Sequence, residues 1–389
     1  MLSGACGANI MLSGACGANI MADERIQRVT MPKWGLSMKT GKIIEWFVAE
    51  GDTIAKGDDL ADIETEKIAG TLESPREGLL RRIVGETGKD LPVGATLAVV
   101  APAEVPDDEI EAVVAEAMAQ LESGALDEGD EVAPSTVEVD GRSISYITLG
   151  AGGDGSGGDP VVLVHGFGGD KNSWLFVQQP LSETHTVHAL DLPGHGQSGK
   201  DVGDGSLDTL ADTVLGFLDA VGADRAHLVG HSLGGAVVAR VAARSPERVA
   251  SLGLLAPAGY GSAVDAEYLR GFAAASSRRE LKPLLGRLFA DESQVTRQLV
   301  DDLLKYKRLD GVSEALQTLL GTLLVGDQQA IDLPALLEKV SVPVTVVWGG
   351  ADRILPVPDG VDLQRVDAGH MLHMEAANDV LRHIQATVS

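Results

Sequence analysis

The chain has 389 residues, of which 44% are hydrophobic, and this is enough for two or three domains with apolar cores. Its formal net charge of −26 leaves no basic surface to neutralise phosphates, which excludes a nucleic-acid partner. No apolar run approaches the roughly 20 residues that span a bilayer, so we expect no membrane segment.

Residues 1–20 consist of the ten-residue segment MLSGACGANI and an identical copy of it. The segment lacks the basic and apolar regions of a secretory signal, so we expect it to be an artefact of the gene start or of cloning, or to be disordered. Cys6 and Cys16 are the two cysteines of the chain. The rest of the chain therefore has no thiol for a disulfide, a metal site or catalysis, which fits a reducing cytoplasm.

Residues 25–101 contain an internal repeat in which equivalent positions lie 37 residues apart. Two short, strand-like halves with glycine turns predict a small all-β domain of two packed sheets with pseudo-twofold symmetry. Between the halves, the segment DIETEKIAG would form a projecting hairpin that carries Lys67. From the residues alone, Lys67 is either part of a solvated charge cluster or the attachment point of a prosthetic group. The equivalent pairs include Gly41 and Gly78, Ile43 and Leu80, Gly51 and Gly88, Gly57 and Gly94, and Leu60 and Leu97.

Residues 102–135 are rich in Asp and Glu and contain neither Lys nor Arg, which predicts a self-repelling linker. If flexible throughout, a chain of this length has an r.m.s. span of about 30–35 Å. Apolar residues at helical spacing between Ile110 and Leu121 predict one amphipathic helix, followed by Gly124. Such a helix either docks on a neighbouring domain or binds a partner, because a single helix is marginal in water.

Residues 136–389 alternate strand-like and helix-like segments, which predicts a buried, mostly parallel sheet. Asp140–Gly141 predicts a hairpin turn between the first two strands. Residues 264–333 contain helical segments and no predicted strand, so we interpret them as an inserted lid. The predicted strands cover residues 136–140, 143–149, 161–165, 185–190, 226–230, 251–256 and 343–348.

The segment VGHSLGG places Ser232 between Gly230 and Gly234 in the pattern G-x-S-x-G. It follows the apolar strand at 226–230 and precedes a helix-like run, which is the setting of a nucleophile elbow. The N-terminus of that helix would favour negative charge that develops during a reaction. The motif alone is a weak signal in a chain with 47 glycines, so its context carries the prediction.

Candidates for an acid and a base follow Ser232 in the order that this elbow requires. Asp352 comes directly after the strand-like VTVVWGG, and His370 lies in the loop of DAGHMLHMEA. We therefore predict a catalytic triad of Ser232, Asp352 and His370. His373 would lie on the following helix, and His231 would be a packing residue. The nine histidines show no metal-ligand spacing, so we predict no metal site.

Residues 136–389 resemble the α/β-hydrolase superfamily in the stretches HGFGG, DLPGHGQS, GHSLG, GGADRILP and AGHMLHME. The resemblance implies an α/β-hydrolase fold with a helical lid. It also implies that Ser232 is the nucleophile, Asp352 the acid and His370 the base. The N–H groups of Phe167 and Leu233 would form the oxyanion hole.

Residues 25–101 resemble a lipoyl domain over nearly their whole length, with E-T-E-K where many members have E-T-D-K. This resemblance implies a small all-β fold with lipoate in amide linkage to Lys67. Biotin domains share the fold, but their lysine usually lies between methionines. Here Lys67 lies between Glu66 and Ile68, which favours lipoate.

A lipoyl domain joined to an α/β-hydrolase domain resembles the dihydrolipoamide acetyltransferase component of acetoin dehydrogenase complexes. The resemblance implies a cytoplasmic acyltransferase that passes acetyl from lipoyl-Lys67 to coenzyme A. Its implied partners are a thiamine-diphosphate-dependent acetoin-cleaving dehydrogenase, dihydrolipoamide dehydrogenase and a lipoate-attaching enzyme. Two alternatives stay open at this point. The α/β-hydrolase domain would instead use water, as an esterase, thioesterase or C–C hydrolase, or the chain would be a carrier with a vestigial triad.

Overall fold

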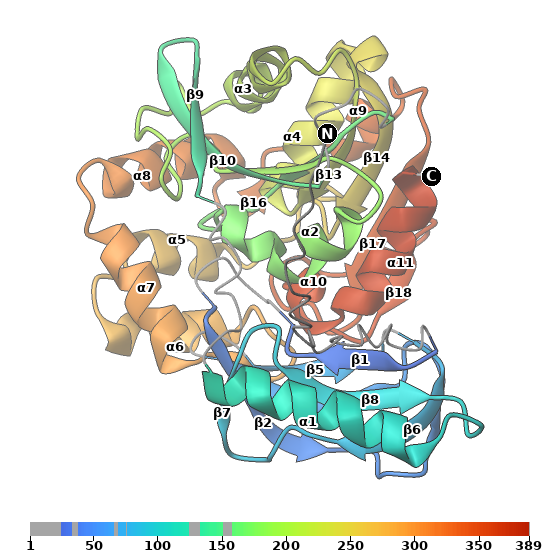
Figure 1. Ribbon diagram of the computed structural model, residues 1–389. Coiled ribbons are helices and arrows are strands. Elements are labelled where there is room, and N and C mark those ends of the chain that lie inside the picture. The colour runs from blue at the N-terminus through green and yellow to red at the C-terminus, as the bar shows by residue number, and fades with distance from the viewer. Residues whose placement is uncertain are drawn as a thin grey trace, which may run out of the picture.

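The computed structural model describes residues 25–32, 38–65, 69–74, 76–123, 133–150 and 158–388. Figure 1 shows that the described chain forms a small all-β domain, in blue, and a larger α/β domain, in green to red. The duplicated residues 1–20 lie outside the described residues, and so does Lys67.

Two four-stranded sheets, ordered β1-β8-β6-β3 and β5-β4-β2-β7, form the N-terminal domain. A shift of 37 residues places β2, β3 and β4 on β6, β7 and β8, and exchanging these pairs turns one sheet order into the other, with β5 in the place of β1. Buried residues such as Ile43, Leu60 and Leu97 fill the core, so two similar halves bury one shared apolar face. The predicted two-sheet domain is confirmed. The strands are β1 (Gln27–Thr30), β2 (Thr40–Trp46), β3 (Thr53–Ile54), β4 (Asp59–Thr65), β5 (Ala69–Glu73), β6 (Gly78–Ile83), β7 (Asp90–Pro92) and β8 (Thr96–Ala101).

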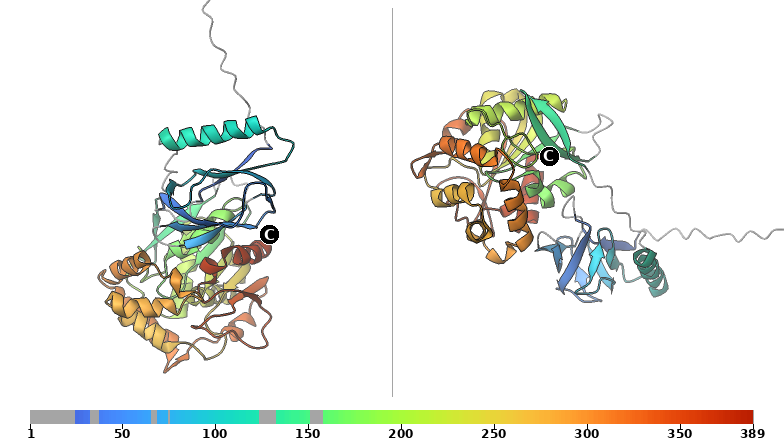
Figure 2. Two further views of the ribbon diagram at one scale, coloured as in Figure 1. Left: turned by 90° about the horizontal axis from the view of Figure 1, so that it is seen from below. Right: turned by 90° about the vertical axis from the view of Figure 1, so that its left-hand side faces the viewer.

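Helix α1 (Asp107–Ser123) is the amphipathic helix of the acidic segment, and it packs on the outside of the N-terminal domain against β6 and β8 (Figure 2). Ile110 is fully buried in a cluster that includes Val99 of β8. At the edge of this contact, Arg81 pairs with Asp107 at 2.6 Å. Of the two alternatives for this helix, docking on a neighbouring domain therefore describes the structure.

The C-terminal domain is built around an eight-stranded sheet ordered β18-β17-β14-β13-β11-β12-β10-β9. Pairing is parallel from β12 to β18 and antiparallel for β9 and β10. Asp140 and Gly141 both have positive φ, 48° and 74°, as a tight hairpin turn requires. The strands are β9 (Ser135–Val139), β10 (Arg142–Leu149), β11 (Val161–Val164), β12 (Val187–Leu190), β13 (Ala226–His231), β14 (Val249–Leu255), β17 (Val344–Gly349) and β18 (Gln364–Val366).

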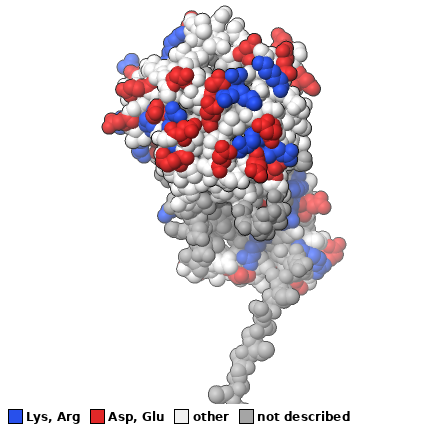
Figure 3. Space-filling view, turned by 90° about the horizontal axis from the view of Figure 1, so that it is seen from above, with Lys and Arg blue, Asp and Glu red and all other residues white. Residues whose placement is uncertain are grey.

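Helices cover the large sheet and place the loops of the candidate site at the carboxyl ends of its parallel strands. They are α2 (Leu175–Leu181), α3 (Leu207–Ala220), α4 (Leu233–Arg244), α9 (Leu333–Leu337), α10 (Leu372–Glu375) and α11 (Ala377–Val388). Figure 3 views the end that holds α3 and α4, where acidic and basic side chains intermingle. Arg240 and Asp208 approach to 2.7 Å there, and Arg244 and Asp212 to 2.8 Å. This face therefore balances its charge locally, although the chain is strongly acidic.

The lid consists mainly of α5 (Ala266–Ala274), α6 (Arg278–Gly286), α7 (Arg297–Lys307) and α8 (Val312–Leu323). The expectation that residues 264–333 contain no strand is wrong. Leu324–Val325 (β15) pairs with Gln328–Gln329 (β16) in a short antiparallel hairpin. Strands of two residues are too short to show an alternation of apolar and polar positions, which explains why the sequence pattern does not reveal them.

Candidate active site

Ser232 lies at a sharp turn between β13 and α4, with φ 53° and ψ −116°. A positive φ is uncommon for a residue that has a side chain. The turn is so tight that a Cβ on Gly230 would lie 2.3 Å from the Gly234 carbonyl oxygen. A Cβ on Gly234 would lie 2.1 Å from the carbonyl oxygen of Val164. Backbone packing therefore requires both glycines of G-x-S-x-G, and the turn presents Ser232 at the end of the sheet.

Asp352 and His370 form a buried pair, with His370 Nδ1 2.8 Å from Asp352 Oδ2. The Asp352 side chain has no exposed area, and that of His370 is 4% exposed. The other carboxylate oxygen, Oδ1, accepts the backbone N–H groups of Ile354 and Leu355 at 2.8 and 2.9 Å. Because both oxygens are bonded, the carboxylate is fixed in orientation and holds the imidazole ring. Ser232 and His370 line one cavity, so the structure brings the three predicted triad residues into the same region.

Two buried histidines hold the loop that follows β11, which sequence reasoning did not foresee. His165 Nε2 accepts a backbone N–H from the loop after β12, so its Nδ1 carries the proton and donates to the Gly166 carbonyl at 2.8 Å. His195 Nε2 accepts the Gly168 N–H at 3.1 Å. Burial lowers the pKa of His195 to about 3, which keeps this ring neutral and able to accept. A Cβ on Gly166 would lie 3.0 Å from the Cβ of Ser232, so the loop runs directly past the serine.

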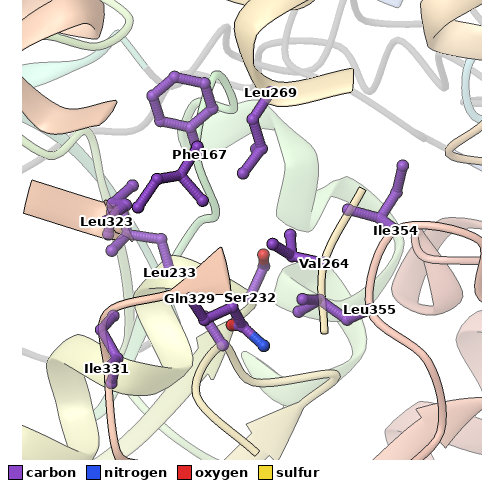
Figure 4. Close-up of a pocket in the computed structure, with 12 residues that line it drawn as sticks. Phe167, Ser232, Leu233, Val264, Leu269, Leu323, Gln329, Ile331, Ile354 and Leu355 are labelled. Atoms are coloured by element: carbon purple, nitrogen blue, oxygen red, sulfur yellow. The ribbon is translucent and has the colours of Figure 1, made fainter. Parts of the chain in front are cut away.

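Phe167 and Leu233 border a small chamber together with Ser232 (Figure 4). Leu233 is the first residue of α4, where backbone N–H groups have no partner within the helix. Phe167 belongs to the loop that His165 and His195 hold. The two backbone positions predicted for the oxyanion hole therefore flank the serine from two separate elements, as the elbow arrangement requires.

A buried ion pair also stabilises the loop that follows β11. Lys171 Nζ lies 2.7 Å from Asp191 Oδ2, and both side chains are almost completely buried. Asp191 also accepts the backbone N–H groups of Lys171 and Gln197, at 2.7 and 2.8 Å. Removing one partner of such a pair costs about 3–5 kcal/mol, because the other charge stays buried and unpaired. Two sequence features could have indicated this pair: Lys171 directly follows HGFGGD, and Asp191 directly follows a buried strand.

Glu375 is a further residue that sequence reasoning missed, and it joins the base loop to the lid. Its carboxylate accepts the backbone N–H groups of Gly369 and Ala290, both at 2.7 Å. Arg353, next to the predicted acid, donates to the carbonyl groups of Gly286 and Phe289 at 2.6 Å. The loops that carry Asp352 and His370 are thus both anchored to the segment after α6.

His231 and His373 pack beside the candidate base. His231 Nε2 donates to the His370 carbonyl oxygen at 2.9 Å. Its ring lies 4.5 Å from that of His373, which in turn lies 4.7 Å from the ring of Trp174. Burial lowers the pKa of His231 well below its usual value and that of His373 to about 3. Both rings are therefore neutral, and their placement is that of packing residues.

Strands β4 and β5 flank the segment that carries the predicted attachment lysine, and their register shifts once, between Asp59 and Ala61. β4 and β5 pair antiparallel, and Glu64 and Ala69 form the last described pair. The residues between these strands, 66–68, include Lys67 by sequence and lie outside the described residues. The described pairing of β4 with β5 fits the two strands of the predicted hairpin, and Lys67 as the attachment residue stays a prediction.

Two family models match this chain: one described as alpha/beta hydrolase fold covers residues 159–377, and one described as biotin-requiring enzyme covers residues 27–100. The dihydrolipoyllysine-residue acetyltransferase component of the acetoin cleaving system of Pseudomonas putida is 48% identical over 369 residues, or 93% of this chain and 98% of that relative. The chain belongs to this family. The corresponding component of Cupriavidus necator is 46% identical over 361 residues, covering 90% of this chain and 94% of that relative.

Comparison with solved structures bears on the fold alone. A membrane phospholipase A superposes with a TM-score of 0.57 and 28% sequence identity, over 71% of this chain and 94% of that chain. The predicted combination of a lipoyl domain and an α/β-hydrolase domain is confirmed. Within the described ranges, no helix is long and apolar enough to cross a bilayer. The same ranges contain no cluster of three or more His, Cys, Asp or Glu arranged to hold a metal ion.

Proposed function

We propose that this acetoin-cleaving acetyltransferase component transfers an acetyl group from lipoyl-Lys67 to coenzyme A through an acyl-Ser232 intermediate. The observation that carries the proposal is the cavity that Ser232 shares with His370, whose ring is held by buried Asp352. The same chain has a biotin/lipoyl-type domain in which Lys67 lies, by sequence, between the paired strands β4 and β5. The lipoyl group supplies a thioester, whose carbonyl carbon is open to attack by an activated hydroxyl.

The residues around the cavity have distinct roles in this proposal. His370 accepts the proton of the Ser232 hydroxyl as Oγ bonds to the acyl carbon, and it then returns that proton to the departing sulfur. Asp352 keeps the ring oriented and stabilises its positive charge. The N–H groups of Phe167 and Leu233 stabilise the oxyanion, at about 3–4 kcal/mol for each donor. In the second half His370 takes the proton of the acceptor thiol, the thiolate attacks the acyl carbon, and Ser232 leaves with that proton.

The lining of the large cavity supports a lipoyl arm as the acyl donor. The cavity measures about 220 Å³, and its walls include Phe272, Leu288, Leu303 and Met374. Apolar side chains on this wall accommodate the methylene chain of a lipoyl arm beside Ser232. Names of the relatives describe a component of a cleaving system, which supports a multienzyme complex. The proposed partners are a thiamine-diphosphate-dependent dehydrogenase, dihydrolipoamide dehydrogenase and the enzyme that attaches lipoate.

One experiment separates transfer from hydrolysis. Lipoylated protein charged with labelled acetyl is incubated with coenzyme A, and labelled acetyl-CoA and free acetate are quantified. We expect acetyl-CoA from the unchanged chain and none from Ser232→Ala. Ser182→Ala, at the end of α2, is the matched control and should behave as the unchanged chain. Acetate as the sole product would instead support a hydrolase, and turnover that survives in Ser232→Ala would contradict the triad.

A further inference from the structure

Two cavities of very different size meet at Ser232. The large cavity measures about 220 Å³, and a small chamber that also borders the serine measures about 30 Å³. Phe167, Ser232, Leu269 and Ile354 line both of them, so these side chains mark the boundary. Figure 4 shows the small chamber, with the Ser232 side chain at its edge.

The position of the base tells which part of an acyl donor enters each cavity. His370 must reach the sulfur that leaves and the thiol that arrives, because it exchanges a proton with both. Among the described residues, His370 lines the large cavity and not the small chamber. The sulfur side of the substrate therefore belongs in the large cavity. The substituent on the acyl carbon then enters the second space beside Ser232, the small chamber that Phe167 and Leu233 also line.

The size of the small chamber limits that substituent. A single water needs about 10–15 Å³ on this measure of volume, so about 30 Å³ holds two or three non-hydrogen atoms. An acetyl group has three non-hydrogen atoms, of which the oxygen occupies the oxyanion site. Its methyl group fits, whereas a butyryl group would place two further methylenes against the wall.

The wall of the chamber is held in place by hydrogen bonds. Gln329 of β16 accepts the Gly259 N–H at 2.7 Å and donates to the carbonyls of Gly261 and Ala263, at 3.1 and 2.9 Å. Ile331 closes the same side, since a Cβ on Gly259 would lie only 2.7 Å from its Cγ2. With its amide fully bonded, Gln329 fastens the β15–β16 hairpin to the loop after β14. The chamber therefore resists widening to admit a longer chain.

We propose that the β15–β16 hairpin and the residues that follow it, with Leu324 and Ile331 as lining side chains, restrict the acyl group to acetyl. This inference rests on the proposed role of Ser232 as the acyl-accepting nucleophile. It assigns acyl specificity to a wall of the small chamber that the large cavity does not share.

The test is the rate of ester cleavage by the full chain with p-nitrophenyl acetate, butyrate and hexanoate. We expect kcat/KM for acetate to exceed that for butyrate by at least about tenfold, the discrimination that an excluded methylene provides. Ile331→Ala and Leu324→Ala should lower this ratio about tenfold. Val325→Ala is the matched control, because this side chain is on the same hairpin and 71% exposed. It should leave the ratio unchanged.

Several outcomes would overturn the inference. Equal use of acetate and butyrate by the unchanged chain would contradict it, as would an unchanged ratio in folded Ile331→Ala. Ala258→Val serves if the first variants fail to fold, because it fills the chamber and should slow acetate cleavage at least about tenfold. Unchanged cleavage in Ala258→Val would again contradict the inference. The Ser232→Ala variant separates the two proposals: ester cleavage that survives in it refutes the nucleophile itself, whereas cleavage that depends on Ser232 without chain-length selection refutes the chamber alone.

Discussion

Asp352 uses both carboxylate oxygens, one for His370 and one for two backbone N–H groups. Asn in its place keeps the oxygen that accepts the N–H groups of Ile354 and Leu355, but its NH₂ group then faces His370. The ring would then hold the wrong tautomer, so we expect Asp352→Asn to fold normally and to lose about three to four orders of magnitude in kcat. Hydrolysis of p-nitrophenyl acetate measures this loss. Asp359→Asn, on an exposed turn nearby, should retain full activity, and a loss under tenfold in Asp352→Asn would contradict the triad.

His373 makes the protein sensitive to acid. Its ring is fully buried, and neither nitrogen has a hydrogen-bond partner in the described structure. Burial lowers its pKa to about 3, whereas in the unfolded chain a histidine titrates near 6.5. Between these values the unfolded chain binds a proton that the folded chain does not. Stability contributed by the neutral ring is therefore complete above about pH 6.5 and falls by about 1.4 kcal/mol for each pH unit below it.

His373→Phe removes this titration and keeps a ring against Trp174. Urea unfolding at pH 7.5 and pH 5 should show that the variant loses about 2 kcal/mol less of its free energy of unfolding on acidification than the unchanged chain. If both proteins lost the same free energy of unfolding on acidification, His373 would have the same pKa in the folded and the unfolded chain, and the prediction would be wrong.

At the scale of elements, Glu375 joins the loop that carries His370 to the lid segment after α6. Glu375→Ala removes the acceptor of the Gly369 and Ala290 N–H groups. Hydrogen bonds to a charged group are worth about 1.5–3 kcal/mol, so we expect lower stability and a kcat reduced about tenfold as the base loop loosens. Steady-state kinetics and limited proteolysis of the lid measure both effects. Glu375→Gln keeps an accepting oxygen and should recover part of kcat; no recovery would indicate that the carboxylate acts through its charge.

Local patterns predicted the elements that depend on neighbouring residues, and they missed those that depend on distant ones. The glycines around Ser232 and the strand before it lie within one short segment, so the elbow is readable from sequence. Glu375 bonds to Ala290, 85 residues away in the sequence, and Lys171 bonds to Asp191, 20 residues away. A local periodicity cannot predict such pairs. The sequence analysis missed the β15–β16 hairpin for a different reason: strands of two residues show no alternation of apolar and polar positions.

At the scale of the whole molecule, the two domains divide the proposed work between a carrier and a catalyst. Lys67→Arg keeps the charge but cannot take lipoate, so we expect it to abolish acetyl transfer in the assembled complex. Hydrolysis of p-nitrophenyl acetate should be unchanged, because Ser232 and its cavity lie in the other domain. Lys56→Arg, exposed in the same small domain, is the control. Mass spectrometry should find the lipoyl mass on Lys67 of the unchanged chain, and complex turnover that persists in Lys67→Arg would refute the carrier role.

The docking of α1 on the N-terminal domain has a consequence for how far the carrier travels. With α1 attached to its own domain, twelve peptide units of sequence separate Ser123 from Ser135, the first residue of β9. At about 3.3–3.6 Å for each unit, these residues can separate Ser123 from Ser135 by at most about 40–43 Å. The whole acidic segment would reach more than twice as far if α1 were unfolded. In the proposed transfer, this limit keeps the thioester close to its own chain. It therefore favours delivery to Ser232 of the same polypeptide over Ser232 of a neighbouring one.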